Sequence, residues 1–253
     1  MDLFEVTLLV VGGFAAGAVG AAAGGGGLIT FPVLILIGLP PVSAVVTNTV
    51  ALSPGSFAAV LGNRVDLPDR REWLPLLPTA VVGTVAGSLL LLAAPARVFE
   101  LVVPFLVLGA TATLALQGPL WRLVGHPRDL GPRRRTATLH AVVGAGGVYC
   151  GYFTAALGLV MIAGLALAMD TTMARVNALK NLMGALMGSV TVVVFGLFGP
   201  VNWAAAALLA PAALVGGYAG ARWARRLPSA VLKTVIVACG TTVGLYLLLR
   251  ELT

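Results

Sequence analysis

The chain has 253 residues, of which 59% are hydrophobic and 10% are charged, and its mean hydropathy is +1.01. Because a soluble domain has about a quarter charged residues, this composition predicts a multi-pass protein of the cell (cytoplasmic) membrane, surrounded by the lipid bilayer. The net charge of +7 lies mostly in short loops, which excludes the continuous basic face that nucleic-acid binding needs.

Hydrophobic segments follow one another along the whole chain. A crossing helix needs about 20 apolar residues, and the segments lie near residues 4–22, 27–38, 42–61, 73–93, 98–117, 137–149, 152–169, 173–198, 202–221 and 229–250. Segments 27–38 and 137–149 are too short to cross alone and occupy similar places in the two halves. Short or broken segments at corresponding positions are typical of a transporter's binding site, so we predict an all-α polytopic fold.

A glycine-rich break precedes the first short segment. Four successive glycines cannot hold a helix, because each costs about 1 kcal/mol relative to alanine. Broken backbone at membrane depth is tolerated where protein buries it or where it lines a wet cavity. A new helix starting near Leu28 would direct free N–H groups into the protein and favour an anion there. We therefore interpret the four glycines as substrate-binding: Gly24, Gly25, Gly26 and Gly27. The alternative is a close-packing face between helices.

The two halves of the chain resemble each other. Residues 76–98 align with 209–231 without a gap, and both stretches contain a Gly-x-x-x-Gly motif and matching prolines. The basic residues of the two halves lie in loops that do not correspond to each other. The positive-inside rule therefore puts equivalent loops on opposite sides of the membrane. This pattern predicts two inverted repeats of about four helical segments each, residues 1–117 and 137–253. We expect a basic cytoplasmic linker at 118–136 and broken first helices that meet near the bilayer midplane.

Motifs in both halves carry a family resemblance. The first half has GGGGLITFP at 24–32, then Gly38, Ala44 and Thr47–Thr49; the second has Ala174, GPVNW at 199–203 and Gly216, Gly220 and Leu227–Pro228. Together these motifs resemble the TauE/SafE family of sulfite and organosulfonate exporters over nearly the whole chain. The resemblance implies a transporter fold and an anionic, often sulfur-containing, substrate. The second half has no full glycine run at 153–158, so its break is expected to be milder.

Residues 171–181 carry the two cations that stand apart from the basic loops. On a helix, Asn177, Lys180 and Asn181 share one face at spacings of three and four, whereas Arg175 points elsewhere. A cation at the bilayer centre costs about 2.5–3.5 kcal/mol and usually faces a cavity. We predict that this face binds the anion, with Arg175 as a further candidate. The alternative is a cytoplasmic loop, with Lys180 reaching to the surface.

Other polar residues give weaker signals. Thr47 and Asn48, in the first half, could donate to the same anion or could bond between helices; for Ser56 we favour a bond between helices. Asp170 is the candidate for proton coupling, although capping of the following helix explains it equally well. The cysteines and histidines have no ligand-spaced partners, so we predict no metal and no cofactor.

These features predict a secondary transporter, acting as an exporter, of a small anion such as sulfite or an organosulfonate. We expect it to work by alternating access and not to be an enzyme. Two alternatives stay open. One is an anion channel. The other is a membrane-embedded enzyme or assembly factor, which would need clusters of intramembrane His, Cys, Ser/Lys or carboxylate residues, and the sequence has none. Either reading is compatible with a homo-oligomer.

Overall fold

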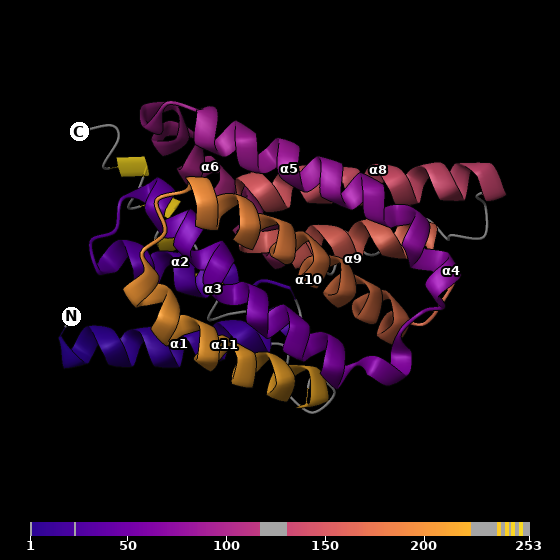
Figure 1. Ribbon diagram of the computed structural model, residues 1–253, viewed down its shortest axis with the longest axis horizontal. Helices are drawn as coiled ribbons and strands as arrows, with labels where there is room; N and C mark the ends of the chain where they lie inside the picture. The colour runs from indigo at the N-terminus through magenta and orange to yellow at the C-terminus, as the bar shows by residue number, and fades with distance from the viewer. Residues whose placement is uncertain are drawn as a thin grey trace.

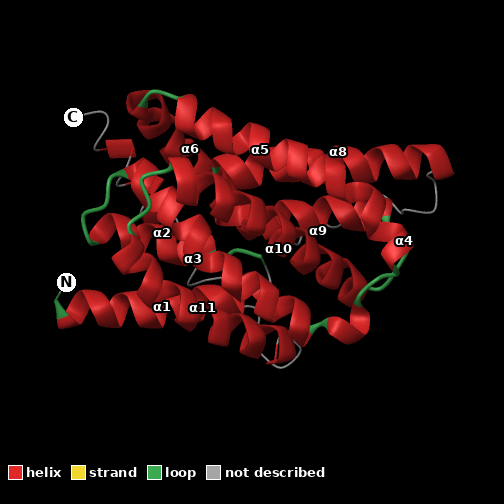
Figure 2. Ribbon diagram, in the orientation of Figure 1, coloured by secondary structure: helices red, strands yellow, loops and turns green. Residues whose placement is uncertain are grey.

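The computed structural model describes residues 2–22, 24–116 and 131–223, together with positions 237, 238, 241, 242, 244, 245, 248 and 249. Among these residues there are helices but no strand (Figure 2). The α-helices are α1 (Leu3–Ala22), α2 (Gly27–Leu36), α3 (Pro41–Gly62), α4 (Arg70–Trp73), α5 (Leu77–Ala93), α6 (Ala96–Ala115), α8 (Pro132–Tyr152), α9 (Leu157–Ala168), α10 (Met173–Phe198) and α11 (Trp203–Trp223). Short 3-10 turns occur as η1 (Arg64–Asp66), η2 (Leu74–Leu76) and η4 (Thr154–Ala156). The predicted all-α fold is confirmed.

Five stretches are long and apolar enough to cross a membrane: Leu3–Ala22, Pro41–Gly62, Arg70–Ala93, Met173–Phe198 and Trp203–Arg222. These helices support the predicted multi-pass membrane protein. The short apolar helices are α2 and α9. Segment 137–149 lies within a longer helix, because the polar turn Arg133–Arg135 belongs to α8, which has 21 residues. Helix α8 is nevertheless not among the stretches that are long and apolar enough to cross.

Small residues bring two pairs of helices into close contact. A Cβ atom on Gly17 of α1 would lie 2.2 Å from the carbonyl oxygen of Ala213 in α11. In the same way, a Cβ atom on Gly87 of α5 would lie 2.1 Å from the carbonyl oxygen of Val148 in α8. Small residues allow this approach of helix backbones in membranes. Each pair joins one helix from the first half of the chain to one from the second (Figure 1).

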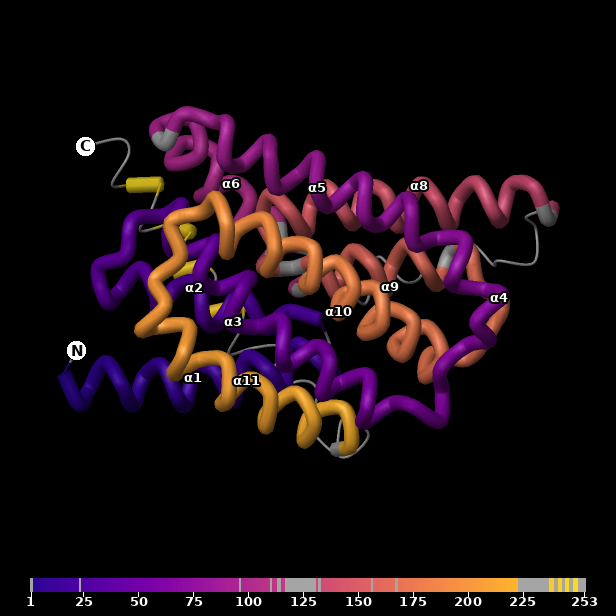
Figure 3. Tube along the Cα trace, viewed as in Figure 1, coloured from indigo at the N-terminus to yellow at the C-terminus, as the bar shows by residue number. Residues whose placement is uncertain are grey.

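Helices α3 and α10 run in opposite directions at the centre of the molecule (Figure 3). Ser43 Oγ, at the start of α3, donates a hydrogen bond of 2.8 Å to the carbonyl oxygen of Pro200, just after α10. At the other end, Arg175 at the start of α10 pairs with Glu72 in α4, which follows α3. Inverted repeats require this orientation; the side of the membrane that each end faces stays a prediction.

The chain breaks between α1 and α2 and again between α8 and α9. Gly24 in the first break has a φ of +88°, which glycine adopts without the cost that a Cβ atom brings. In the second break the extended residue Phe153 is followed by η4. A Cβ atom on Gly158 would lie 2.2 Å from the Cα atom of Gly24. The two broken helices therefore cross in backbone contact at Gly24 and Gly158.

Candidate functional site

A cavity of about 80 Å³, the central cavity, lies where the two breaks cross, between α1, α2, α3, α9 and α10. Glycines form much of its wall, and four polar side chains reach it: Ser56, Thr154, Lys180 and Asn181. Because a water molecule needs only about 10–15 Å³ of such space, the cavity has room for a small ligand of several heavy atoms.

Helix α10 presents three side chains to the C-terminal end of α1. Lys180 Nζ donates to the carbonyl oxygens of Gly20, at 2.9 Å, and Ala21, at 3.3 Å. The Nδ2 atoms of Asn177 and Asn181 donate to the same Ala21 oxygen at 3.2 and 3.3 Å. The last carbonyl groups of a helix have no partner within it, so this face of α10 closes the broken end of α1.

Lys180 is a buried cation without a carboxylate beside it. Its side chain is 4% exposed, and within the described ranges its polar partners are the two carbonyl groups. The C-terminal end of α1 carries a partial negative charge of about half a unit, which offsets part of the lysine's charge. An ammonium group has three N–H donors, so one remains for a ligand in the central cavity.

The predicted glycines both line the cavity and pack closely. Gly24, Gly26 and Gly27 belong to its wall, and Gly25 is buried beside them. A Cβ atom on Gly26 would lie 2.1 Å from the carbonyl oxygen of Ala16. The glycines thus pack closely and line the cavity, and their role in binding the substrate stays a prediction. Helix α2 begins at Gly27 without a side-chain cap, and the glycines at its start line the cavity.

Thr47 and Asn48 do not line the central cavity. Thr47 Oγ1 accepts a hydrogen bond of 2.9 Å from the backbone N–H of Asn202. Asn48 Oδ1 accepts one from the hydroxyl group of Thr30 in α2. Both residues are buried. Their hydrogen bonds join different segments of the chain, as their alternative interpretation predicted.

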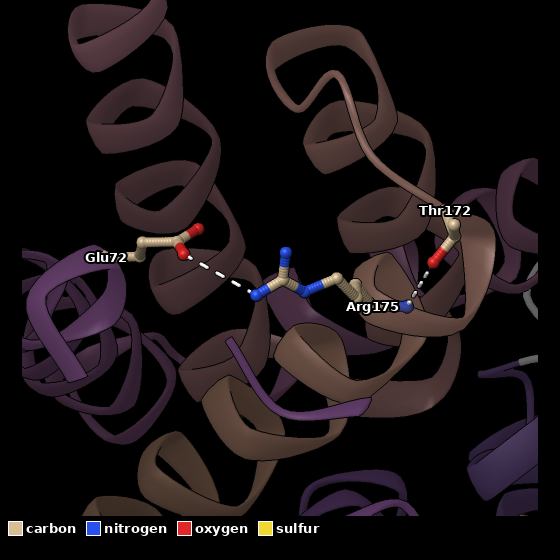
Figure 4. Close-up of polar contacts among 3 residues, drawn as sticks. All are labelled: Glu72, Thr172 and Arg175. Carbon is tan, nitrogen blue, oxygen red and sulfur yellow. Dashed lines mark hydrogen bonds and ion pairs between the residues drawn. The ribbon is translucent and has the colours of Figure 1, made fainter. Parts of the chain in front are cut away.

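Arg175 also does not line the central cavity. Its Nη2 atom is 3.7 Å from Glu72 Oε1 (Figure 4), and both side chains are more than two-fifths exposed, at 41% and 43%. Its backbone N–H donates to Thr172 Oγ1 at 3.4 Å, which makes Thr172 the cap of α10. Asp170 is exposed in the preceding loop, and the cap position that its alternative interpretation gave to Asp170 is occupied by Thr172.

Two hydroxyl groups at the cavity were not predicted as site residues. Thr154 Oγ1 donates to the carbonyl oxygen of Cys150 at 2.7 Å and lies 2.8 Å from Thr49 Oγ1. The sequence signal for Thr154 was that the second break has this residue within 153–158, where the first break has a run of glycines. Ser56, on the α3 wall, was expected to bond between helices, and nothing in its local sequence indicated the cavity.

A second, larger cavity of about 730 Å³ lies between α3, α10 and α11. Apart from Ser53 and Ser189, the described residues that line it are apolar or aromatic. Several of them, such as Phe57 and Trp203, are about half exposed. The described wall of this cavity has no charged residue, whereas Lys180 lines the central cavity.

Comparison with known proteins agrees with this picture. The family model "Sulfite exporter TauE/SafE" matches residues 9–247. A "Probable membrane transporter protein ORF9" of Sinorhizobium sp is 28% identical over 96% of this chain and 92% of its own. The "Probable membrane transporter protein YfcA" of Escherichia coli (strain K12) is 31% identical over 89% of this chain and 83% of its own. A "Probable membrane transporter protein" of Haemophilus influenzae is 36% identical over 43% of this chain and 42% of its own. No solved structure matches the chain.

Proposed function

Since this chain belongs to the sulfite exporter TauE/SafE family and is a multi-pass membrane transporter, we propose that it is a secondary transporter of a small anion, sulfite or an organosulfonate. Alternating access would expose the central cavity first to one side of the membrane and then to the other. The export direction rests on the family description.

The observation that carries this proposal is the position of Lys180. Its ammonium group is buried at the wall of the central cavity, with one N–H donor left over from its bonds to α1. A lone buried charge is costly, and a bound anion would offset that cost. An ammonium is a compact point charge that tolerates varied oxyanion geometry, as sulfite and sulfonates require.

The surroundings of Lys180 support an oxyanion as the ligand. Thr154 and Ser56 bring hydroxyl groups to the cavity, and Asn181 brings an amide. The start of α2 at Gly27 adds the positive end of a helix dipole. Oxygen atoms of a sulfonate could accept hydrogen bonds from several of these groups at once, which a halide ion cannot do with the same geometry.

The packing of the helices supports alternating access. Each of the close pairs, α1 with α11 and α5 with α8, joins the two halves of the chain, and the broken helices cross between them at Gly24 and Gly158. A rocking movement of one pair against the other would open the central cavity on either side while its wall residues stay together.

Two neutral variants of Lys180 test the proposal. We expect Lys180→Met and Lys180→Gln to bind sulfite and isethionate at least about tenfold more weakly than the wild type, roughly 1.4 kcal/mol. Glutamine keeps an N–H donor for the end of α1, whereas methionine leaves a buried carbonyl group without its partner, at a cost of about 1–3 kcal/mol in stability. Titration calorimetry of purified protein at fixed ionic strength measures the affinities.

The matched control is Arg175→Gln, which removes a charge from the same helix outside the cavity and should leave both affinities unchanged. Wild-type affinity in Lys180→Gln together with weak binding in Lys180→Met would assign Lys180 to closing α1 rather than to the anion. Saturation and counterflow of labelled isethionate in proteoliposomes separate a transporter from an anion channel.

A further inference from the structure

Lys180 is the titratable group of the central cavity within the described part of the chain. Helices α2, α3, α5 and α9 contain no titratable residue, and that of α1, Glu5, lies near the helix start, far from the broken end. The titratable residues of the other elements packed against α10 do not line the cavity: Arg64 and Asp66 of η1, and Arg133–Arg135, His140, Tyr149, Cys150 and Tyr152 of α8. On α10 itself, Arg175 is paired with Glu72.

Asp170, the carboxylate that the sequence suggested for proton coupling, lies away from the central cavity. It is exposed in the loop before α10 and does not line the cavity. A proton bound there would have no direct electrostatic contact with an anion held at Lys180. Coupling through Asp170 would therefore need a conformational link, whereas coupling through Lys180 needs only contact.

We propose that Lys180 carries a proton that is transported together with the anion; this inference rests on the proposed function. In the empty cavity, the amine takes a proton from water on one side, and the resulting ammonium pairs with the incoming anion. After the cavity opens to the other side, the anion leaves and the ammonium releases its proton to water there. One proton and one monovalent anion cross in the same direction, and no net charge moves.

The geometry gives the Lys180 nitrogen partners in both protonation states. The amine has two N–H donors, which the carbonyl groups of Gly20 and Ala21 accept when the cavity is empty, and the third N–H of the ammonium is left for the anion when the cavity is occupied. These carbonyl groups are neutral, so the anion is the partner that balances the charge. Proton and anion then favour each other's binding, by thermodynamic linkage.

Proteoliposomes with the membrane potential clamped at zero test this proposal. The probe is isethionate, a sulfonate whose charge does not change across the neutral pH range. With an alkaline interior, the wild type should accumulate labelled isethionate inside, and an internal pH dye should report matching acidification. Lys180→Arg keeps a cation that does not release its proton. It should show reduced but measurable counterflow of isethionate and no accumulation driven by the pH gradient.

Asp170→Asn is the matched control and should accumulate isethionate like the wild type. Gradient-driven accumulation by Lys180→Arg, or its loss in Asp170→Asn, would overturn the assignment, as would wild-type counterflow without accumulation. Absence of wild-type counterflow would instead overturn the proposed function itself.

A second measurement covers the case in which Lys180→Arg does not fold. Calorimetry of isethionate binding in two buffers of different ionisation enthalpy should show proton uptake by the wild type and equal uptake by Asp170→Asn. Binding without proton uptake across the neutral range would overturn the proposal.

Discussion

The crossing of the two broken helices can be tested with one methyl group. In Gly158→Ala, the new Cβ atom would lie 2.2 Å from the Cα atom of Gly24 and 2.8 Å from its carbonyl oxygen, whereas ordinary contacts begin at 3.4 Å. The atoms in the way are backbone atoms, so no side chain can turn aside. Overpacking typically costs 1–3 kcal/mol and sometimes more, and the backbone contact places this variant at about 3 kcal/mol.

Two other glycines separate this contact from effects of the backbone alone. Gly38 also has a φ of +88°, but a Cβ atom there would meet nothing within 4 Å, so Gly38→Ala measures only the strain, about 1–2 kcal/mol. Gly109 in α6 likewise has open space around its Cβ position, without a positive φ. Gly109→Ala should therefore stabilise the helix by about 0.5–1 kcal/mol.

The assay is the thermal midpoint of the purified protein in detergent. For a chain of this size, 1 kcal/mol shifts Tm by about 2–4 °C. Gly158→Ala should therefore lose roughly 6–12 °C, Gly38→Ala a few degrees, and Gly109→Ala none. If Gly158→Ala has the same thermal midpoint as Gly109→Ala, the two breaks do not cross in contact. The crossing that defines the central cavity would then be wrong.

Two further predictions concern the ends of the helices. In a background without native cysteines, Arg134→Cys should be labelled by a membrane-impermeant reagent only from the cytoplasm and Asn202→Cys only from outside, because the basic loops set the orientation; labelling of both from one side would contradict the inverted repeats. Glu72→Gln breaks the ion pair with Arg175, and because both side chains are substantially exposed it should change the free energy of unfolding by less than about 1 kcal/mol. A larger loss in denaturant titrations would show that this pair holds α4 against α10.

The lengths of the spanning helices could be predicted from the sequence, because an apolar run of crossing length restricts where a helix can begin and end. Segments 4–22 and 173–198 correspond to α1 and α10. For 137–149 the apolar run gave the apolar part of α8 but not the length of the helix, because the helix also contains the polar turn Arg133–Arg135. The predicted segment 73–93 also differs from the helix found there. Pro75 lies in the 3-10 turn η2 and Pro78 in the first turn of α5, so the helix proper begins only at Leu77.

The candidate site could be predicted where the signal is local. Asn177, Lys180 and Asn181 share a face by helical spacing alone, and the structure brings all three to one helix end. Gly20, a partner of Lys180, is 160 positions away in the sequence, and no local pattern indicates it. Small or apolar residues occupy nearly every side of α3, so its sequence does not fix which way Thr47 and Asn48 point. Contacts with Thr30 and Asn202 decide that.

The two breaks are closed by different chemistry, and this difference determines the charge of the cavity. The end of α1 is closed from the other half of the chain by a set that includes Lys180. The end of α8 is closed by Thr154, from the break itself, whose hydroxyl group donates to Cys150. A hydroxyl group satisfies a helix end without adding charge, so the described part of the cavity contains one cation. Under the proposed function, one ammonium balances one monovalent anion, and a second anion would stay unpaired in a buried site at high cost. The weaker glycine pattern of the second half is thus more than a sequence irregularity, because it marks the break at which a neutral group closes the helix end.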